Sequence, residues 1–335
     1  MICLGIETSC DDTSLAILKK NSDCSISILY EKKYTQDEML QKWGGVVPEI
    51  ASRNHLDKLA VITRLLKEDS PVFMNDIDLI AVTTHPGLLG PLLTGINFAK
   101  NLSLLFEKPI QGVNHLWAHL EAIHLSQKIE YPYLGVLISG GHSFITLFEQ
   151  DAQVILAKTL DDAAGEAFDK AGKMLGLPYP GGKWIDQLAQ KGDPYKYPFS
   201  IGLAGKKDMS FSGLKTAIRN FIEKHDVHFN HQNQMLFDLC ASYQETIVRT
   251  LLEKIDLVYS ELPKDFPIVV GGGVACNSRL RMALKEKYPN VYFVEPKYCE
   301  DNATMISHYA LKHPQNTLPF PHCLELDAQN RFLTK

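Results

Sequence analysis

The chain has 335 residues, of which 45% are hydrophobic and 22% are charged, and this composition is that of an ordinary globular enzyme. The length is too great for one ordinary core and predicts two domains or two lobes. The formal net charge is −5, so contact with nucleic acid requires a local basic face or a basic partner.

Composition also argues against secreted and membrane-spanning proteins. There are seven cysteines, an odd number, and none forms a C-x-x-C pair. This argues against a disulfide framework and against a cysteine-cluster zinc site, and it indicates a reducing cytosol. The first residues reach Glu7 without a basic region, so we expect no signal peptide. Residues 79–99 lack charged side chains, but their prolines and glycines indicate a strand, a turn and a helix rather than a membrane span.

The predicted elements, taken from the N-terminus, indicate an internal duplication. Residues 2–18 predict a strand, a polar turn and a second strand, and residues 79–105 predict a strand, a glycine and proline turn, and a helix. Residues 133–148 and 267–287 repeat the two layouts in the same order. Chance similarity is the alternative, because strand–glycine–helix units are common in α/β proteins. Duplication predicts an α/β protein of two similar lobes, with the polar turns and glycine turns at one central cleft.

Apolar residues at helical spacing predict further helices. These cover residues 47–67, 92–105, 115–127, 165–175, 184–190, 212–224, 232–257 and 302–312. We expect an N-terminal lobe of residues 1–130 and a C-terminal lobe of residues 131–300. A C-terminal helix and tail, residues 301–335, is expected to cross back to the first lobe.

Two histidines four residues apart are the first candidate for chemistry. His115 and His119 share one face of a predicted helix and can bind one metal ion, although two unrelated polar positions would have the same spacing. Zinc proteases of the H-E-x-x-H type place their general base directly after the first histidine. Leu116 occupies that position, which argues against proteolysis.

A third ligand for such a site is Glu121 or Asp301. Asp301 follows a strand-like run and opens a helix, so a simple N-cap role explains it equally well. Two histidines and one carboxylate leave coordination positions open for substrate, and this ligand set suits Fe(II) or Zn(II).

Two glycine turns are candidates for binding an anion. The turns at residues 139–142 and 271–273 can bring backbone N–H groups against a phosphate, because glycine permits a close approach. Neither matches the Rossmann or Walker A pattern, and a purely geometric role for the glycines is the commoner explanation.

Several carboxylates and one group of basic residues complete the candidates. Asp11 and Asp12 lie in the first polar turn, where turn chemistry alone also explains them. Carboxylates near predicted helix starts can bind ribose hydroxyls or cap helices; these are Asp162, Glu166, Asp169 and Asp186. The best local basic cluster is either an RNA contact or a solvated surface; it comprises Lys206, Lys207, Lys215 and Arg219.

Together these segments resemble the TsaD family, formerly described as O-sialoglycoprotein endopeptidase. The resemblance covers nearly the whole chain to about residue 312 and rests on the following segments: GIETSCDDT at residues 5–13, GGVVPE at 44–49, ASR at 51–53, Asn114-His115 with His119, SGGH at 139–142, residues 162–170, YPGG at 179–182, SFSGLK at 210–215, GGGVA at 271–275 with Asn277, and Asp301-Asn302.

The resemblance implies an actin/sugar-kinase/Hsp70-like duplicated fold and one divalent metal ion, with Fe(II) favoured over Zn(II). It implies that the metal ligands are His115, His119 and Asp301. It further implies nucleotide or adenylate contacts from Leu137, Ile138, Ser139, Gly140, Gly141, Asp169, Gly182, Asp186 and Asn277.

The implied reaction is transfer of a threonylcarbamoyl group from threonylcarbamoyl-AMP to N6 of the adenosine 3′ of the anticodon, A37, in tRNAs that read ANN codons, with release of AMP. The implied partners are tRNA, a TsaB-like paralogue and a TsaE-like ATPase, in the cytoplasm and without a membrane. Our hypothesis is that Asp11 or Asp12 accepts the amine proton or supports the groups that contact the metal ion and the substrate. The competing functions are a small-molecule kinase or carbamoyltransferase of the same fold and a non-catalytic scaffold.

The chain departs from the family pattern at four positions. His85 stands before Pro86 where the family has glycine, and Lys183 stands where proline is common. Asp12 replaces a frequent glutamate, and Cys276 replaces alanine. The first departure puts the geometry of the turn after residue 84 in doubt.

Overall fold

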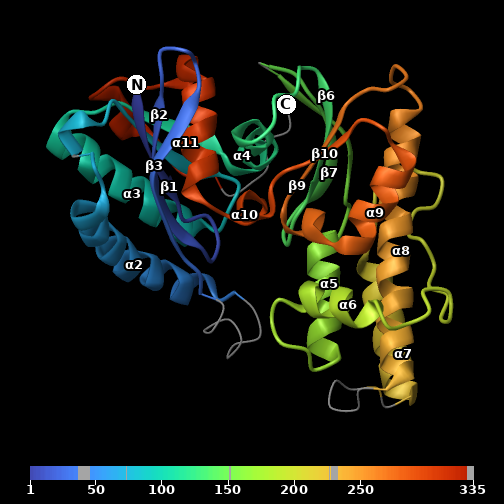
Figure 1. Ribbon diagram of the computed structural model, residues 1–335. Helices are drawn as coiled ribbons and strands as arrows, with labels where there is room; N and C mark the ends of the chain where they lie inside the picture. Colours follow the sequence, from blue (N-terminus) through green and yellow to red (C-terminus); the bar gives the residue numbers. More distant parts are fainter. Residues whose placement is uncertain (37–45, 73, 151, 226, 228–232, 330–335) are drawn as a thin grey trace. The chain divides into compact units, whose positions relative to one another are not determined.

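The computed structural model describes residues 1–36, 46–72, 74–150, 152–225, 227 and 233–329 (Figure 1). The chain divides into two compact units. Unit 1 comprises Met1–Ser126 and Glu300–Lys335, and unit 2 comprises Gln127–Cys299. Residues 44–45 of the family segment at 44–49, and residue 232 of the predicted helix at 232–257, lie outside the described residues.

Unit 1 contains a five-stranded mixed sheet in the order β3-β2-β1-β4-β5. Its strands are β1 (Ile2–Glu7), β2 (Thr13–Lys20), β3 (Ile26–Tyr34), β4 (Leu79–His85) and β5 (Ile110–Asn114). The first three strands form an antiparallel meander, with Leu4 opposite Ile17, while β4 runs parallel to β1 and β5 runs parallel to β4.

Unit 2 repeats this topology strand for strand. Its strands are β6 (Tyr133–Ile138), β7 (Ser143–Phe148), β8 (Gln153–Lys158), β9 (Ile268–Gly271) and β10 (Val291–Phe293), in the order β10-β9-β6-β7-β8. Again the first three strands are an antiparallel meander, and β9 is parallel to both β6 and β10. The duplication and the α/β class expected from the sequence are therefore confirmed.

The helices of unit 1 pack against its sheet through their apolar faces. They are α2 (Pro48–Asp69), α3 (Leu89–Phe106), α4 (His115–Glu121) and α11 (Ala303–Lys312), with short 3₁₀ turns at Met74–Asp76, Ala122–Leu125, Pro314–Asn316 and His322–Glu325. Buried side chains of α2 and α3 share one hydrophobic cluster with β1, β2 and β4. In the view of Figure 1, α2 and α3 lie on one side of the unit 1 strands and α11 lies on the other.

Helix α11 packs directly against β1. A Cβ atom at Gly5 would lie 2.4 Å from the Ala303 carbonyl oxygen, so only glycine allows this approach. The hydroxyl of Ser307 donates to the carbonyls of Cys3 and Ala16, at 3.3 Å in each case. These contacts bring a segment from the end of the chain to the first two strands.

The helices of unit 2 are α5 (Ala164–Met174), α6 (Gly181–Ala189), α7 (Ser212–His225), α8 (Gln234–Tyr259), α9 (Ser278–Lys287) and α10 (Pro296–Cys299), with a 3₁₀ turn at Gly273–Cys276. The predicted helices match those observed to within a few residues, except that the one expected at 115–127 is helical only to Glu121 and then tightens into the 3₁₀ turn. Among the described residues, no helix has the combination of length and apolar character that a bilayer crossing demands.

Candidate metal centre and anion-binding turn

The two candidate histidines are placed by the end of β5. The Asn114 side chain accepts hydrogen bonds from the backbone N–H groups of Leu116, at 2.9 Å, and Trp117, at 3.3 Å. This N-cap starts α4 directly after the strand. His115 and His119 are therefore one helical turn apart on the same face, and both are buried.

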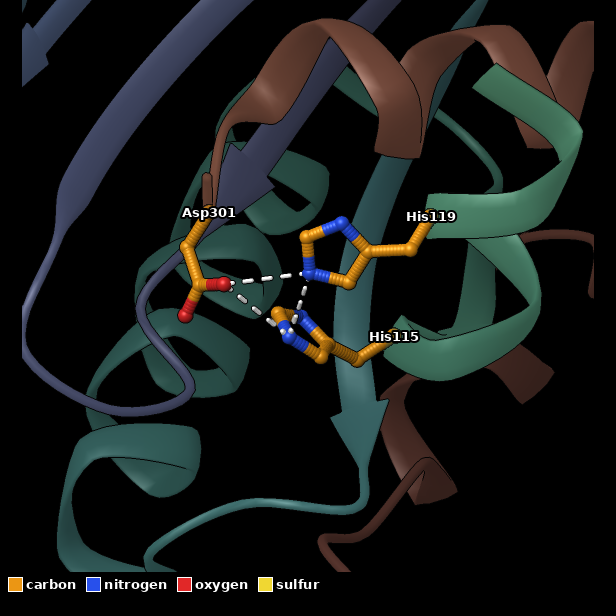
Figure 2. A group of neighbouring side chains, drawn as sticks. All are labelled: His115, His119 and Asp301. Carbon is orange, nitrogen blue, oxygen red and sulfur yellow. Dashed lines mark hydrogen bonds and ion pairs between the residues drawn. The ribbon is translucent and has the colours of Figure 1, made fainter. Parts of the chain in front are cut away.

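Asp301 joins the two histidines from the segment that precedes α11. Its Oδ1 atom lies 3.1 Å from Nε2 of His119 and 3.3 Å from Nε2 of His115, and the two Nε2 atoms are 3.1 Å apart. Figure 2 shows the three side chains pointing toward one another. Within the described residues they form the one group of three or more such side chains that can hold a metal ion.

The geometry distinguishes the two acidic candidates for the third ligand. The N-cap of α11 is Asn302, whose side chain accepts from the Met305 N–H at 2.8 Å, so Asp301 does not serve as the cap. Glu121 is fully buried and lies 3.9 Å from Nε2 of His124, away from the group of three.

Glu7 supports the candidate centre and was not selected from the sequence. Its Oε2 atom lies 3.1 Å from Nδ1 of His115 and accepts a hydrogen bond from the Thr83 hydroxyl, while Oε1 accepts from the Ser9 N–H at 2.6 Å. A carboxylate only accepts, so the His115 Nδ1 atom carries a proton and Nε2 is the nitrogen that can ligate an ion. The signal in the sequence was a carboxylate closing a buried strand.

The spacing of the three ligand atoms fits one metal ion. Ligand atoms about 2.1 Å from a tetrahedral ion lie about 3.4 Å from each other, close to the observed separations of 3.1–3.3 Å. Two imidazole nitrogens and one carboxylate oxygen suit Fe(II) or Zn(II) and leave positions open for substrate.

The electrostatics also suit a cation. Burial raises the pKa of Asp301, but the charge of His115 and hydrogen bonds from both rings outweigh it and hold this pKa well below its usual range. Burial likewise lowers the pKa of His115, but Asp301 and Glu7 hold it well above its usual value. The carboxylates therefore stay ionised, and the proton favoured on Nε2 of His115 is the one that a metal ion would replace.

Asp11 and Asp12 lie in the turn between β1 and β2, as expected from the sequence. Asp12 is buried, and its Oδ2 atom lies 3.1 Å from the Nζ atom of Lys33, which also pairs with Glu300 at 2.7 Å. Burial raises the pKa of Asp12 to about 8 despite the charge of Lys33. Burial therefore makes the Asp12 carboxyl group a weaker acid than an exposed aspartate.

In unit 2, the turn at residues 139–142 links β6 to β7. The Ser139 N–H donates to the His142 carbonyl at 2.8 Å, and the His142 N–H donates to the Ser139 hydroxyl at 3.1 Å. Cβ atoms at Gly140 and Gly141 would meet no heavy atom within 4 Å. The two glycines therefore leave open space beside the backbone, as an anion-binding turn requires.

Two other glycines hold that turn in place. Gly165, in the first turn of α5, donates its N–H to the Ser139 carbonyl at 3.2 Å, and a Cβ there would lie 2.5 Å from the same oxygen. Gly272, after β9, has a φ of +86°, and a Cβ there would lie 2.5 Å from the Ile138 carbonyl. Ile138, at the end of β6, and Ser139, in the turn, are thus packed against Gly272 and Gly165 respectively, and Leu137 pairs with Gly271 of β9.

The remaining nucleotide candidates are linked to one another within unit 2. Asp169 accepts from the Gly182 N–H at 3.4 Å. Asp186 accepts from the Ser278 N–H at 3.1 Å and from its hydroxyl at 2.7 Å. Asn277 caps α9 by accepting from the Leu280 N–H, and its amide donates to Gln244 at 2.7 Å.

Two expectations about carboxylates at helix starts were wrong. Ala163, not Asp162, is the N-cap of α5, and Asp162 and Glu166 both pair with Lys170 at 2.8 Å. Asp186 lies inside α6 rather than at its start. The basic cluster is partly neutralised by neighbouring carboxylates: Lys207 pairs with Glu261 at 2.6 Å, and Arg219 lies 3.9 Å from Glu223.

The topology and the two turns define a protein of the actin/sugar-kinase/Hsp70-like fold with a candidate metal centre in its first unit. Solved structures share this fold at low sequence identity. Full-length HypF is 14% identical, with a TM-score of 0.59 over 94% of this chain and 46% of that one. The activator of the 2-hydroxyisocaproyl-CoA dehydratase from Clostridium difficile is 13% identical, with a TM-score of 0.54 over 94% and 96%.

Sequence comparison identifies the family. Residues 27–308 match the family model described as TsaD, tRNA N6-adenosine threonylcarbamoyltransferase. Proteins of that name from Lawsonia intracellularis and Thermosipho africanus are each 44% identical; they align over 92% of this chain and over 91% and 92% of their own lengths. The chain belongs to the TsaD family and is a transferase that modifies tRNA.

Proposed function

We propose that the chain transfers the threonylcarbamoyl group of threonylcarbamoyl-AMP to N6 of A37 in tRNAs that read ANN codons. The bond between N6 and the carbamoyl carbon forms, the bond from that carbon to the phosphate oxygen breaks, and AMP leaves. The observation that carries the proposal is the convergence of His115, His119 and Asp301 in a member of this family.

Unit 1 would hold the metal ion through these three side chains, with Fe(II) favoured over Zn(II). When bound, the ion supplies a Lewis acid that polarises an oxygen of the acyl donor. Glu7 orients the His115 ring through its hydrogen bond to Nδ1, so that Nε2 faces the other two ligands.

The amine of adenosine is a poor nucleophile and must lose a proton as it reacts, and Asp11 or Asp12 would accept it. Asp12 has the support of a pKa raised by burial to about 8, since a general base works best when its pKa lies near the working pH. Lys33 holds the Asp12 carboxylate through its ion pair.

Unit 2 would hold the adenylate. The open turn at Gly140 and Gly141 offers backbone N–H groups to the phosphate, which gains charge as it departs. The N-terminus of α9, capped by Asn277, favours an anion as well. Asp169, Gly182 and Asp186 would complete the nucleotide contacts, with the Asp carboxylates directed to ribose hydroxyls.

The charge balance supports additional partners in tRNA binding. The net charge is −5, and two members of the basic cluster already have acidic neighbours. We infer that a TsaB-like paralogue and a TsaE-like ATPase act with this chain and supply part of the basic surface that RNA requires. Cysteines that form no disulfide within the described residues support a reducing cytosol.

The test is transfer of label to tRNA. Purified protein would be incubated with tRNA, radiolabelled threonine, bicarbonate, ATP and the partner enzymes, with His115→Ala as the matched control. Label should enter tRNA with the intact protein and not with the variant. ATP turnover on a sugar or acid acceptor without tRNA would instead favour a kinase of the same fold, and no turnover at all would favour a scaffold.

A further inference from the structure

His55 is a polar residue in an apolar row. The buried positions of α2 are Ala51, His55, Leu59, Ile62 and Leu66, which is the spacing of a helix face packed on a core. His55 is fully buried among them. Leucine at this position would suit the row without the cost of burying a polar ring, so the imidazole has another role.

Both ring nitrogens of His55 contact the turn after β1. Nε2 lies 3.1 Å from the carbonyl oxygen of Cys10, and Nδ1 lies 2.8 Å from the hydroxyl of Thr13. A carbonyl can only accept, so Nε2 carries the proton and Nδ1 accepts from the Thr13 hydroxyl. One neutral tautomer therefore satisfies both contacts, and burial favours it by lowering the pKa of the ring.

The two contacts enclose Asp11 and Asp12. Cys10 directly precedes this pair and Thr13 directly follows it, so one ring from α2 holds the turn on both sides. The start of the turn is held separately, because the Leu88 N–H donates to the Ser9 carbonyl at 2.9 Å. Without His55, the Cys10 carbonyl and the Thr13 hydroxyl lose these two hydrogen bonds to α2.

We propose that His55 is a positioning residue that fixes the turn bearing Asp11 and Asp12. This inference rests on the proposed function for its effect on rate, because a general base must be within hydrogen-bond reach of the proton it takes. Displacement of a reacting group by about 1 Å can reduce a rate about 100-fold. His55→Leu is therefore expected to lower kcat about 10- to 100-fold, with the KM for tRNA and the affinity for the metal ion within about twofold of wild type.

Variants that keep one of the two hydrogen bonds of His55 test whether these bonds, and not the bulk of the ring, determine kcat. His55→Gln can keep an N–H donor for the Cys10 carbonyl, and His55→Asn can keep an acceptor for the Thr13 hydroxyl, so each should recover part of the lost kcat. Thr13→Val removes one of the two contacts of His55 and should therefore lower kcat less than His55→Leu does. Leu59→Ala, in the same buried row but with a side chain that cannot hydrogen-bond to the turn, should lower Tm while leaving kcat unchanged at a temperature well below Tm.

Hydrogen exchange tests the same inference without the reaction. Peptides that cover residues 9–14 should exchange faster in His55→Leu than in wild type, whereas peptides from β4 should be unchanged. Wild-type kcat together with unchanged exchange in His55→Leu would overturn the inference. Absence of transfer by the wild-type protein would contradict the proposed function alone, and the exchange experiment would still decide the role of His55.

Discussion

The two units share one topology but use its first turn differently. In unit 1 the turn between β1 and β2 is largely buried and carries two carboxylates, with a further carboxylate, Glu7, at the end of β1. In unit 2 the equivalent turn carries Gly140 and Gly141, with open space beside both. The duplicated sheet sets where the turn lies, while the residues of the turn decide whether it carries buried carboxylates or open backbone.

The turn after the fourth strand is alike in the two units. A Cβ at Gly87, after β4, would lie 2.7 Å from the Ser9 carbonyl, and a Cβ at Gly272, after β9, would lie 2.5 Å from the Ile138 carbonyl. In both units a glycine permits close packing against the end of the first strand or the turn that follows it. Gly87 keeps this contact although His85 replaces the glycine usual in the family.

Replacement of a proposed metal ligand should have the largest effect, and a small effect would contradict the difference drawn between the two units. Asp301→Ala is expected to weaken metal binding more than 100-fold, since loss of a supporting residue alone typically costs about 10- to 100-fold. Metal content after equilibrium dialysis measures this. His322→Ala changes an exposed histidine and should bind metal like wild type; equal loss in both variants would contradict the assignment.

Removal of the support for His115 should have the next largest effect. Glu7→Gln keeps the shape of the side chain but loses the charge that accepts from Nδ1. We expect metal affinity to fall about 10- to 100-fold, measured by competition with a chelator. Unchanged affinity would mean that the carboxylate does not orient the ring.

Two glycine substitutions in unit 2 should separate ligand binding from stability. Gly141→Val introduces a side chain into open space, so it should leave the free energy of unfolding nearly unchanged but weaken AMP binding. Gly272→Ala places a Cβ at φ +86° against a carbonyl and should destabilise the protein by about 1–3 kcal/mol. Calorimetric titration and urea unfolding measure these effects. A destabilised Gly141→Val protein would contradict the view that this turn is open.

The smallest effect concerns a histidine on α11 away from the candidate centre. Burial, and then the charges of His124, Lys312 and His313, lower the pKa of His308 from 6.5 to about 3. The unfolded chain therefore binds this proton at a higher pH than the folded chain, so stability is lost as the pH falls below 6.5. At about 1.4 kcal/mol per pH unit, acidification to pH 5 should cost about 2 kcal/mol through His308.

Urea unfolding at pH 7 and pH 5 checks this contribution. His308→Leu removes the titrating ring, so the variant should lose less stability between the two pH values than wild type does. Equal losses in the two proteins would show that His308 does not titrate between its folded and unfolded states in this range.

Sequence reasoning found those parts of the site that depend on local spacing. His115 and His119 could be paired because four residues make one helical turn, and the glycine turns could be paired because each follows an apolar strand. The resemblance to TsaD supplied Asp301, whose contact with His119 spans 182 residues. Spacing alone left Asp301 and Glu121 equally possible as the third ligand.

The parts that sequence reasoning missed depend on contacts between distant segments. Glu7 contacts His115, which lies 108 residues farther along the chain. The residues next to Glu7 in the sequence do not reveal that partner. The edge strands β3 and β8 were not predicted; each mixes exposed and half-buried positions and has one fully buried residue, so neither has a clear inward-facing side. β5 was also missed, because it has only five residues and includes Gln111 and Gly112.

X-ray absorption spectroscopy of the metal-loaded protein tests most directly whether unit 1 uses side chains to hold an ion. We expect scattering from two imidazole rings and oxygen ligands at about 2.0–2.2 Å, and loss of one imidazole contribution in His119→Ala. A first shell without imidazole, or one with sulfur from nearby Cys10, would contradict the metal centre of His115, His119 and Asp301.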